Sequence, residues 1–88
     1  MTVRISDRAL RNLAEVYDHI AADNAEAAAR VAGRILQAIN RLGQMPRWGR
    51  ESQLRRRREL VVDQYVVVYS IRRGEVVVET ITHGARRR

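Results

Sequence analysis

The chain has 88 residues, of which 45% are hydrophobic and 31% charged, and its formal net charge is +7 at pH 7. This length suits a single domain over residues 1–88 with a modest core, and leaves no room for a second domain. There is no cysteine and there are only two histidines, which excludes disulfides and the common metal sites, so no metal or other cofactor is expected. No segment has the apolar length of a signal peptide or a membrane span, which favours a cytoplasmic protein without a membrane partner.

All 17 basic residues are arginine, and their excess lies in the second half of the chain. Residues 1–43 contain six arginines against five acidic residues, whereas residues 44–88 contain eleven against five. Guanidinium groups stay charged at any working pH and pair with carboxylate or phosphate through two parallel hydrogen bonds. Nucleic acid, a nucleoprotein machine or an acidic protein segment therefore each fit as a partner.

The first half of the chain has the hydrophobic spacing of two helices. Ser6 and Asp7 suit the start of the first helix, whose apolar residues recur every three or four positions. These residues are Leu10, Leu13, Ala14, Tyr17, Ile20 and Ala21. Asp23 and Asn24 interrupt this pattern, which predicts a tight antiparallel hairpin with Asn24 as the second N-cap.

The second predicted helix is longer and ends near Gly43 and Pro46. Its apolar residues are Ala28, Val31, Ala32, Ile35, Ala38, Ile39 and Leu42. We expect Gly43 to adopt a left-handed C-cap, and Pro46 cannot continue the helical hydrogen bonds.

The rest of the chain has the composition of β-strands. Runs at residues 59–62, 65–71 and 75–83 are rich in valine, tyrosine, isoleucine and threonine and are separated by short turns, which predicts antiparallel neighbours. The middle run is apolar on both faces over its first half, as a central strand would be. In the last run Val77, Glu79, Ile81 and His83 are expected on one face and Val76, Val78, Thr80 and Thr82 on the other. With an edge strand at Thr2–Ile5, the prediction is an α+β fold of order β-α-α-β-β-β, a helix hairpin packed on a small twisted antiparallel sheet.

No phosphate-binding loop, cysteine nucleophile or G-x-S-x-G motif is present. His19 falls on the polar side of the first helix, where we expect a solvated residue. His83 ends the last strand, in the sequence ITHGARRR. Beside arginines, its imidazole suits a general acid or base acting on RNA, and a purely structural hydrogen bond is the other interpretation.

Two segments together resemble the RelE/ParE superfamily of bacterial type II toxin-antitoxin toxins, and the resemblance is closer to ParE. The segment DNAEAAARVAGRILQAINRLGQMPRWGR is similar to the second helix of the family and its Pro-x-x-Gly-Arg exit, and RELVVDQYVVVYSI with ITHGARRR is similar to its sheet. Ala25 stands where the family usually has proline, which is a small departure because proline at that position is favoured and not required.

This resemblance implies one of two activities. ParE-like toxins bind DNA gyrase and block replication without being enzymes, whereas RelE-like toxins cut mRNA on the ribosome. The resemblance makes Arg58, His83 and Arg86 the catalytic candidates for a nuclease. No aromatic residue follows Tyr69, however, so the C-terminal tyrosine or phenylalanine of the ribonuclease members is missing. The sequence therefore favours gyrase inhibition, with ribosome-dependent mRNA cleavage as the alternative.

The resemblance also implies a cognate antitoxin whose C-terminal segment wraps the toxin, with operator DNA bound only through that antitoxin. The arginine-rich stretch RWGRESQLRRRREL is the predicted docking surface for the antitoxin or the target. Its candidate binding residues, together with two from the C-terminus, are Trp48, Arg50, Arg55, Arg56, Arg57, Arg58, Arg86 and Arg87. Trp48 suits either an exposed apolar anchor or packing beneath the hairpin.

Overall fold

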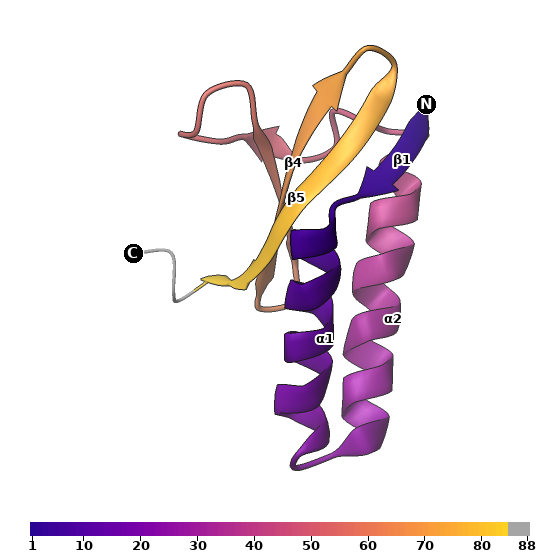
Figure 1. The fold of residues 1–88 in the computed structure, drawn as a ribbon, viewed down its shortest axis with the longest axis vertical. Helices are drawn as coiled ribbons and strands as arrows, with labels where there is room; N and C mark the ends of the chain where they lie inside the picture. Colours follow the sequence, from indigo (N-terminus) through magenta and orange to yellow (C-terminus); the bar gives the residue numbers. More distant parts are fainter. Residues whose placement is uncertain (85–88) are drawn as a thin grey trace.

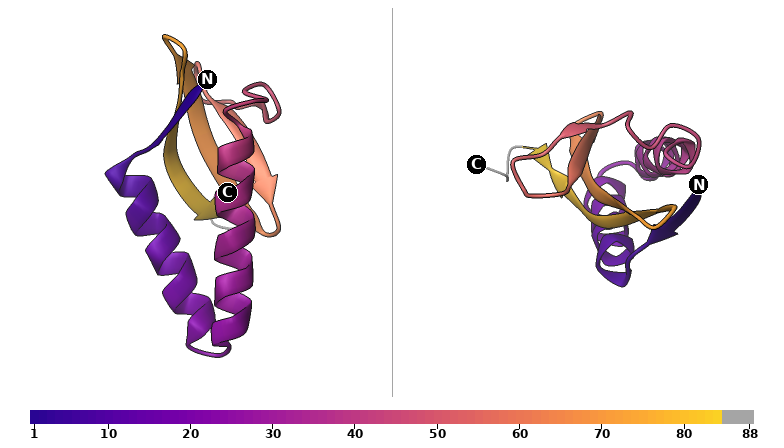
Figure 2. Two further views of the ribbon diagram at one scale, coloured as in Figure 1. Left: turned by 90° about the vertical axis from the view of Figure 1, so that its right-hand side faces the viewer. Right: turned by 90° about the horizontal axis from the view of Figure 1, so that it is seen from above.

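The computed structural model describes residues 1–84 and has two layers, a helix hairpin and a five-stranded sheet (Figures 1 and 2). The elements are β1 (Thr2–Ile5), α1 (Asp7–Ala21), α2 (Ala25–Arg41), β2 (Arg50–Glu51), β3 (Arg58–Val62), β4 (Tyr65–Arg72) and β5 (Glu75–His83). The hairpin packs against one face of the sheet, and its tip extends well beyond the strands (Figure 1). Within residues 1–84, no helix is long and apolar enough to cross a membrane.

Both predicted N-caps are confirmed. The Ser6 hydroxyl accepts a hydrogen bond from the Ala9 N–H at 3.0 Å, and the Asn24 side-chain oxygen accepts one from the Ala27 N–H at 3.0 Å. Each cap satisfies a backbone donor that has no partner inside its helix, which fixes where α1 and α2 begin.

The end of α2 differs from the prediction. Gly43 is not left-handed, and the chain leaves the helix through tight turns in which the Gly43 N–H donates to the Asn40 carbonyl at 3.1 Å. The reason for a glycine here is space, because a Cβ at Gly43 would lie 2.9 Å from the Met1 carbonyl oxygen. The Met1 ammonium also donates to the Gly43 carbonyl at 3.0 Å, so the N-terminus packs directly on this turn.

The α+β prediction is confirmed, and β4 is the central strand as expected. The strand order is β1-β5-β4-β3-β2. Two details differ from the predicted antiparallel sheet: β1 pairs with β5 in parallel, which makes the sheet mixed, and β2 adds a short strand at the other edge. The pairing is parallel because β1 and β5 both start at the end of the sheet where the β4–β5 turn lies, with Thr2 opposite Glu75.

The predicted alternation along β5 is wrong beyond Val78. Tyr69 pairs with Val78 and Val68 with Thr80, so Glu79 is an extra residue that forms a β-bulge. The bulge shifts the alternation by one, and Val78 and Ile81 both join the core. Ser6 stabilises the bulge, because its hydroxyl donates to the Glu79 carbonyl at 3.0 Å and its N–H to the Val78 carbonyl at 2.9 Å.

The core lies between the hairpin and the sheet. Its largest fully buried side chains are Tyr69, Ile35, Ile39, Leu42, Val67, Val76 and Val78. The first helix buries Ala9 and Val16, whereas Leu10 and Tyr17 from its predicted apolar face remain 48% and 39% exposed. The two helices therefore carry more apolar surface than this small sheet covers.

Candidate functional site

The arginine-rich stretch forms the connection between α2 and β3, looped out from the sheet at the end away from the hairpin tip (Figure 1). The structure divides its arginines into those held by other groups and those left on the surface. The held arginines shape the loop, and the surface arginines remain for a partner.

Arg57 is held by the bulge residue Glu79. Its Nε donates to Glu79 Oε1 at 2.6 Å, and the Ser70 hydroxyl donates to Glu79 Oε2 at 3.0 Å. Burial of Glu79 alone would raise its pKa, but the hydrogen bonds from Arg57 and Ser70 and the positive charges of Arg57 and Arg72 outweigh burial and lower the pKa. Arg57 thus anchors the loop on β5, and less than half of its side chain is exposed.

Arg50 is paired in a similar way with Glu59. Glu59 is only 7% exposed and accepts a hydrogen bond from the Ser52 hydroxyl at 2.9 Å and one from Arg50 at 3.3 Å. The Arg50 side chain itself is 70% exposed, so it can meet a partner while it neutralises this carboxylate.

Arg58 and Tyr69 hold the start of the stretch. The Arg58 guanidinium donates to the carbonyls of Gly49 and Arg47 at 3.0 and 3.3 Å. The Tyr69 hydroxyl donates to the Pro46 carbonyl at 2.7 Å and accepts the Gly49 N–H at 2.9 Å. Sequence reasoning missed this role of Tyr69, since no local pattern links a central-strand tyrosine to a distant loop.

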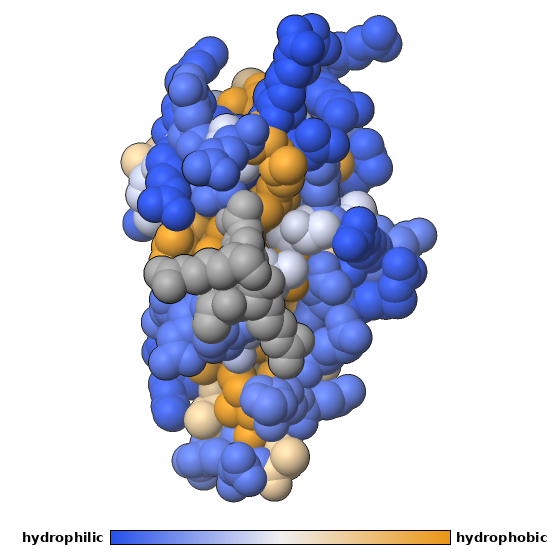
Figure 3. Space-filling view, turned by 90° about the vertical axis from the view of Figure 1, so that its left-hand side faces the viewer, coloured by the Kyte–Doolittle hydropathy of each residue, from blue (hydrophilic) through white to orange (hydrophobic). Residues whose placement is uncertain are grey.

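The remaining candidates lie on the surface. Arg55 and Arg56 are exposed, and Trp48 is 42% exposed instead of packed beneath the hairpin. The Arg41 guanidinium carbon lies 5.8 Å from the centre of the Trp48 ring, a cation–π arrangement. Arg86 and Arg87, the two C-terminal candidates, lie outside the described residues. The side of the molecule shown in Figure 3 is mostly hydrophilic, with bands of hydrophobic surface between the polar side chains.

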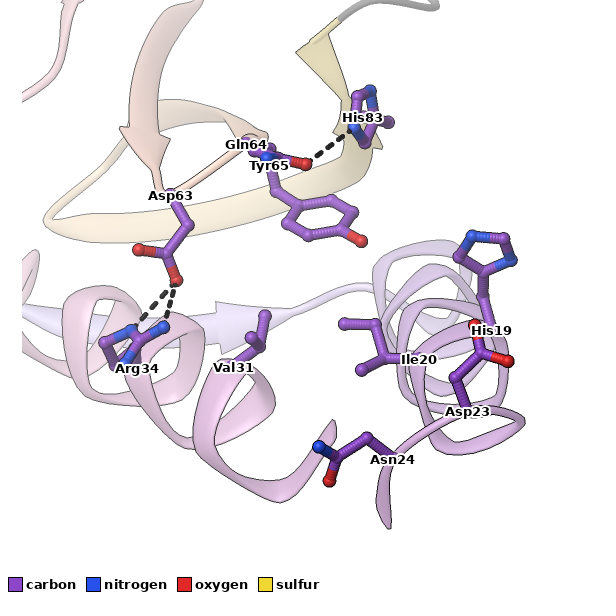
Figure 4. Close-up of a pocket in the computed structure, with 10 residues that line it drawn as sticks. All are labelled: His19, Ile20, Asp23, Asn24, Val31, Arg34, Asp63, Gln64, Tyr65 and His83. Carbon is purple, nitrogen blue, oxygen red and sulfur yellow. Dashed lines mark hydrogen bonds and ion pairs between the residues drawn. The ribbon is translucent and has the colours of Figure 1, made fainter. Parts of the chain in front are cut away.

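A groove separates the hairpin tip from the adjoining end of the sheet, and both histidines line it (Figure 4). Tyr65 directs its hydroxyl into this space, and Arg34 and Asp63 form an ion pair of 2.9 Å at its border (Figure 4). His19 is exposed, as predicted. Within residues 1–84, no cluster of three histidine, cysteine or acidic side chains could hold a metal ion.

His83 is engaged at the end of β5. Its ring packs edge-on against Tyr65 with 5.4 Å between ring centres, and its Nε2 lies 3.2 Å from the Gln64 side-chain oxygen. These contacts fix the orientation of the imidazole at the wall of the groove.

His83 and Arg58 do not converge. Arg58 pairs with Tyr69 and His83 with Tyr65, so the two are offset by four positions along β4, about 13 Å along a strand. The Arg58 guanidinium is held by the carbonyls of residues 47 and 49, and His83 by Gln64 and Tyr65.

The structure also brings in two arginines that sequence reasoning left out. Arg34 and Arg41 lie seven residues apart on α2 and share its surface toward β3, where both line a hollow with Trp48. Their heptad spacing was the available signal, because residues seven apart lie on one face of a helix.

Comparisons with known proteins give one family model, two related toxins and one solved structure with the same fold. Residues 3–88 match the model of the ParE toxin of the type II toxin-antitoxin system parDE. The Y4kP protein of Sinorhizobium fredii is 39% identical over 83 residues, which cover 92% of this chain and 85% of that protein. Toxin RelE2 of Caulobacter vibrioides is 35% identical over 79 residues, with 90% of each chain covered. A solved structure from the chromosomal ParDE system of P. aeruginosa has the same fold, with a TM-score of 0.87, 20% identity, and coverage of 94% of this chain and 95% of that one.

Proposed function

Because the chain belongs to the ParE toxin family of type II toxin-antitoxin systems, we propose that it inhibits DNA gyrase and so blocks replication. In this proposal the toxin acts by binding, and its exposed arginines contact the target. The alternative is ribosome-dependent cleavage of mRNA, as in RelE-like relatives.

The distance between Arg58 and His83 is the main observation that favours gyrase inhibition over mRNA cleavage. A ribonuclease needs its proton-transferring group and its charge-stabilising groups around one scissile phosphate, within hydrogen-bond reach of the reacting atoms. Here about 13 Å of strand separates the two residues. Two backbone carbonyls also engage the Arg58 guanidinium. This arrangement favours a binding protein.

The exposure of the aromatic residues also favours a binding protein over a ribonuclease. Stacking on a base would be expected to contribute about 1 to 3 kcal/mol in single-stranded RNA recognition. Tyr69 is fully buried and Tyr65 is 8% exposed, which leaves Trp48 as the accessible ring of the second half of the chain. One feature favours the alternative, namely that His83 lines an open groove with Tyr65.

We also propose that a cognate antitoxin neutralises the toxin by covering the arginine-rich stretch, and that operator DNA is bound only through the antitoxin. Arg55 and Arg56 are exposed, and Arg50 keeps 70% of its side chain accessible. An acidic antitoxin segment would offset this charge, which is otherwise screened only over a Debye length of about 8 Å.

The test is a supercoiling assay with purified DNA gyrase beside an mRNA cleavage assay on translating ribosomes. Loss of supercoiling with intact mRNA is expected, and mRNA cleavage with gyrase unaffected would overturn the proposal. His83→Ala refines the answer, because a nuclease that uses the imidazole should lose at least about a hundredfold in rate, whereas a binder should change little. His19→Ala is the matched control, since this second histidine lines the same groove.

A further inference from the structure

The sheet has an open edge on β3. The short strand β2 pairs only with Arg58 and Glu59, and within residues 1–84 no strand pairs with residues 60–62 on that side. Gly49 directly precedes β2, and its N–H donates to the Tyr69 hydroxyl at 2.9 Å. A Cβ there would lie 2.7 Å from both the Glu59 carbonyl oxygen and the Tyr69 hydroxyl oxygen, so the chain passes close to β3 at this point, where its pairing with β3 begins.

The backbone of Val61 faces this open edge. The Ser52 N–H donates to the Arg57 carbonyl, so Arg57 points its backbone groups toward β2. Backbone groups alternate in direction along an antiparallel strand, and therefore those of Glu59 and Val61 point the same way. The Val61 side chain is 54% exposed, which agrees with an uncovered edge.

Two hollows flank this edge, one on each face of the sheet, and Val61 and Asp63 border both. The hollow on the α2 side is about 600 Å³ and is lined by Arg34, Arg41 and Trp48. The hollow on the other face is about 820 Å³ and is lined by polar groups that include Arg50, Gln53 and Glu59.

We propose that the β3 edge binds an acidic protein segment in an extended conformation, which adds a strand beside residues 60–62. Such a strand would exchange backbone hydrogen bonds with Val61 and send alternate side chains into the two hollows. Its carboxylates enter the α2-side hollow, because Arg41 forms no ion pair within the described residues and its guanidinium already lies over Trp48.

The overall charge of +7 disfavours a second copy of the chain as the occupant and favours an acidic one. Only the identity of the partner rests on the proposed antitoxin binding. The edge, the hollows and the arginines do not depend on it.

The experiment uses the full chain and a synthetic peptide with alternating glutamate and valine, capped at both ends. Trp48 is the only tryptophan in the chain, so its fluorescence reports directly on the α2-side hollow. A saturable change in emission is expected, together with slower hydrogen exchange of the Val61 amide. A peptide in which lysine replaces glutamate should bind at least about tenfold more weakly, and so should one N-methylated at alternate residues.

Variants separate backbone pairing from general charge attraction. Val61→Pro removes the edge-facing N–H and should weaken binding about fivefold or more, whereas Val61→Ala keeps the N–H and should change it little. Arg41→Gln should weaken binding, and Arg11→Gln, an exposed arginine on α1, should not. Circular dichroism checks that each variant is folded.

Three results would overturn the proposal: no emission change at millimolar peptide, equal binding of the N-methylated peptide, or a homodimer joined through β3. Co-purification with a cognate antitoxin is measured separately. An antitoxin that binds without protecting the Val61 amide would leave the proposed function intact and remove the edge inference.

Discussion

Replacing Tyr69 with phenylalanine should destabilise the protein strongly, although it removes one oxygen atom. Tyr69 is fully buried, and its hydroxyl joins the Pro46 carbonyl and the Gly49 N–H. Two lost hydrogen bonds at about 1 kcal/mol each, with a buried N–H left unsatisfied, lower the free energy of unfolding by about 2 to 4 kcal/mol. For a domain of this size, that corresponds to a fall in Tm of at least about 8 °C.

Tyr65→Phe is the matched control for this change. Tyr65 lies on the same strand and is 8% exposed, but its hydroxyl points into the open groove, where water can replace a partner (Figure 4). Its loss should lower the free energy of unfolding by less than about 0.5 kcal/mol. Urea unfolding of both variants measures the difference. Equal losses in the two variants would refute the assigned role of the Tyr69 hydroxyl, and a normal Trp48 emission in folded Tyr69→Phe would show that residues 46–49 do not depend on it.

Three further predictions concern the bulge, the caps and the glycines. Glu79→Gln should lower the free energy of unfolding at pH 7, and this loss should shrink as the pH falls below 4.5. The reason is that the pKa of Glu79 is lowered below its ordinary value of 4.5 in the folded protein, so the ionised carboxylate stabilises the fold fully only above pH 4.5. A loss that does not change with pH in urea unfolding would contradict this. Ser6→Ala should lower the free energy of unfolding by about 2 kcal/mol, since it removes both a cap and the bond to the bulge, whereas Asn24→Ala should lower it by about 1 kcal/mol; equal losses would exclude the second role. Gly33→Ala should raise Tm, because the added Cβ meets no atom within 4 Å on a helix, and Gly49→Ala should lower it, because the added Cβ meets two oxygens at 2.7 Å; thermal melts compare the pair.

The parts of the fold that depend on neighbouring residues could be predicted from the sequence. Ser6 and Asn24 act within the first turn of their own helices, and the apolar run of β4 already indicated a central strand. The bulge at Glu79 could not be predicted, because it is fixed by Ser6 from 73 residues away. Gly43 was misassigned for the same reason, since the group that requires a glycine there is the distant Met1 carbonyl.

In the candidate site, too, only the features that depend on neighbouring residues could be predicted from the sequence. Sequence alone located the arginine-rich stretch, since clustering is a local property. It could not separate the surface arginines from Arg57 and Arg58, whose partners are set by strand register. The open edge of β3 could not be predicted either, because it depends on where β2 begins to pair with β3.

The parallel pairing of β1 with β5 affects when the protein can finish folding during its synthesis. Synthesis runs from the N-terminus, yet residues 2–5 pair with residues 75–78, and the start of α1 bonds to the same strand. On the ribosome the nascent chain therefore has its helices before it has the strand that fastens β1, and long-range pairing of this kind is slow to form. The sheet can be completed only after residues 75–78 have been synthesised, so an antitoxin already present can meet the chain while β1 is still unpaired.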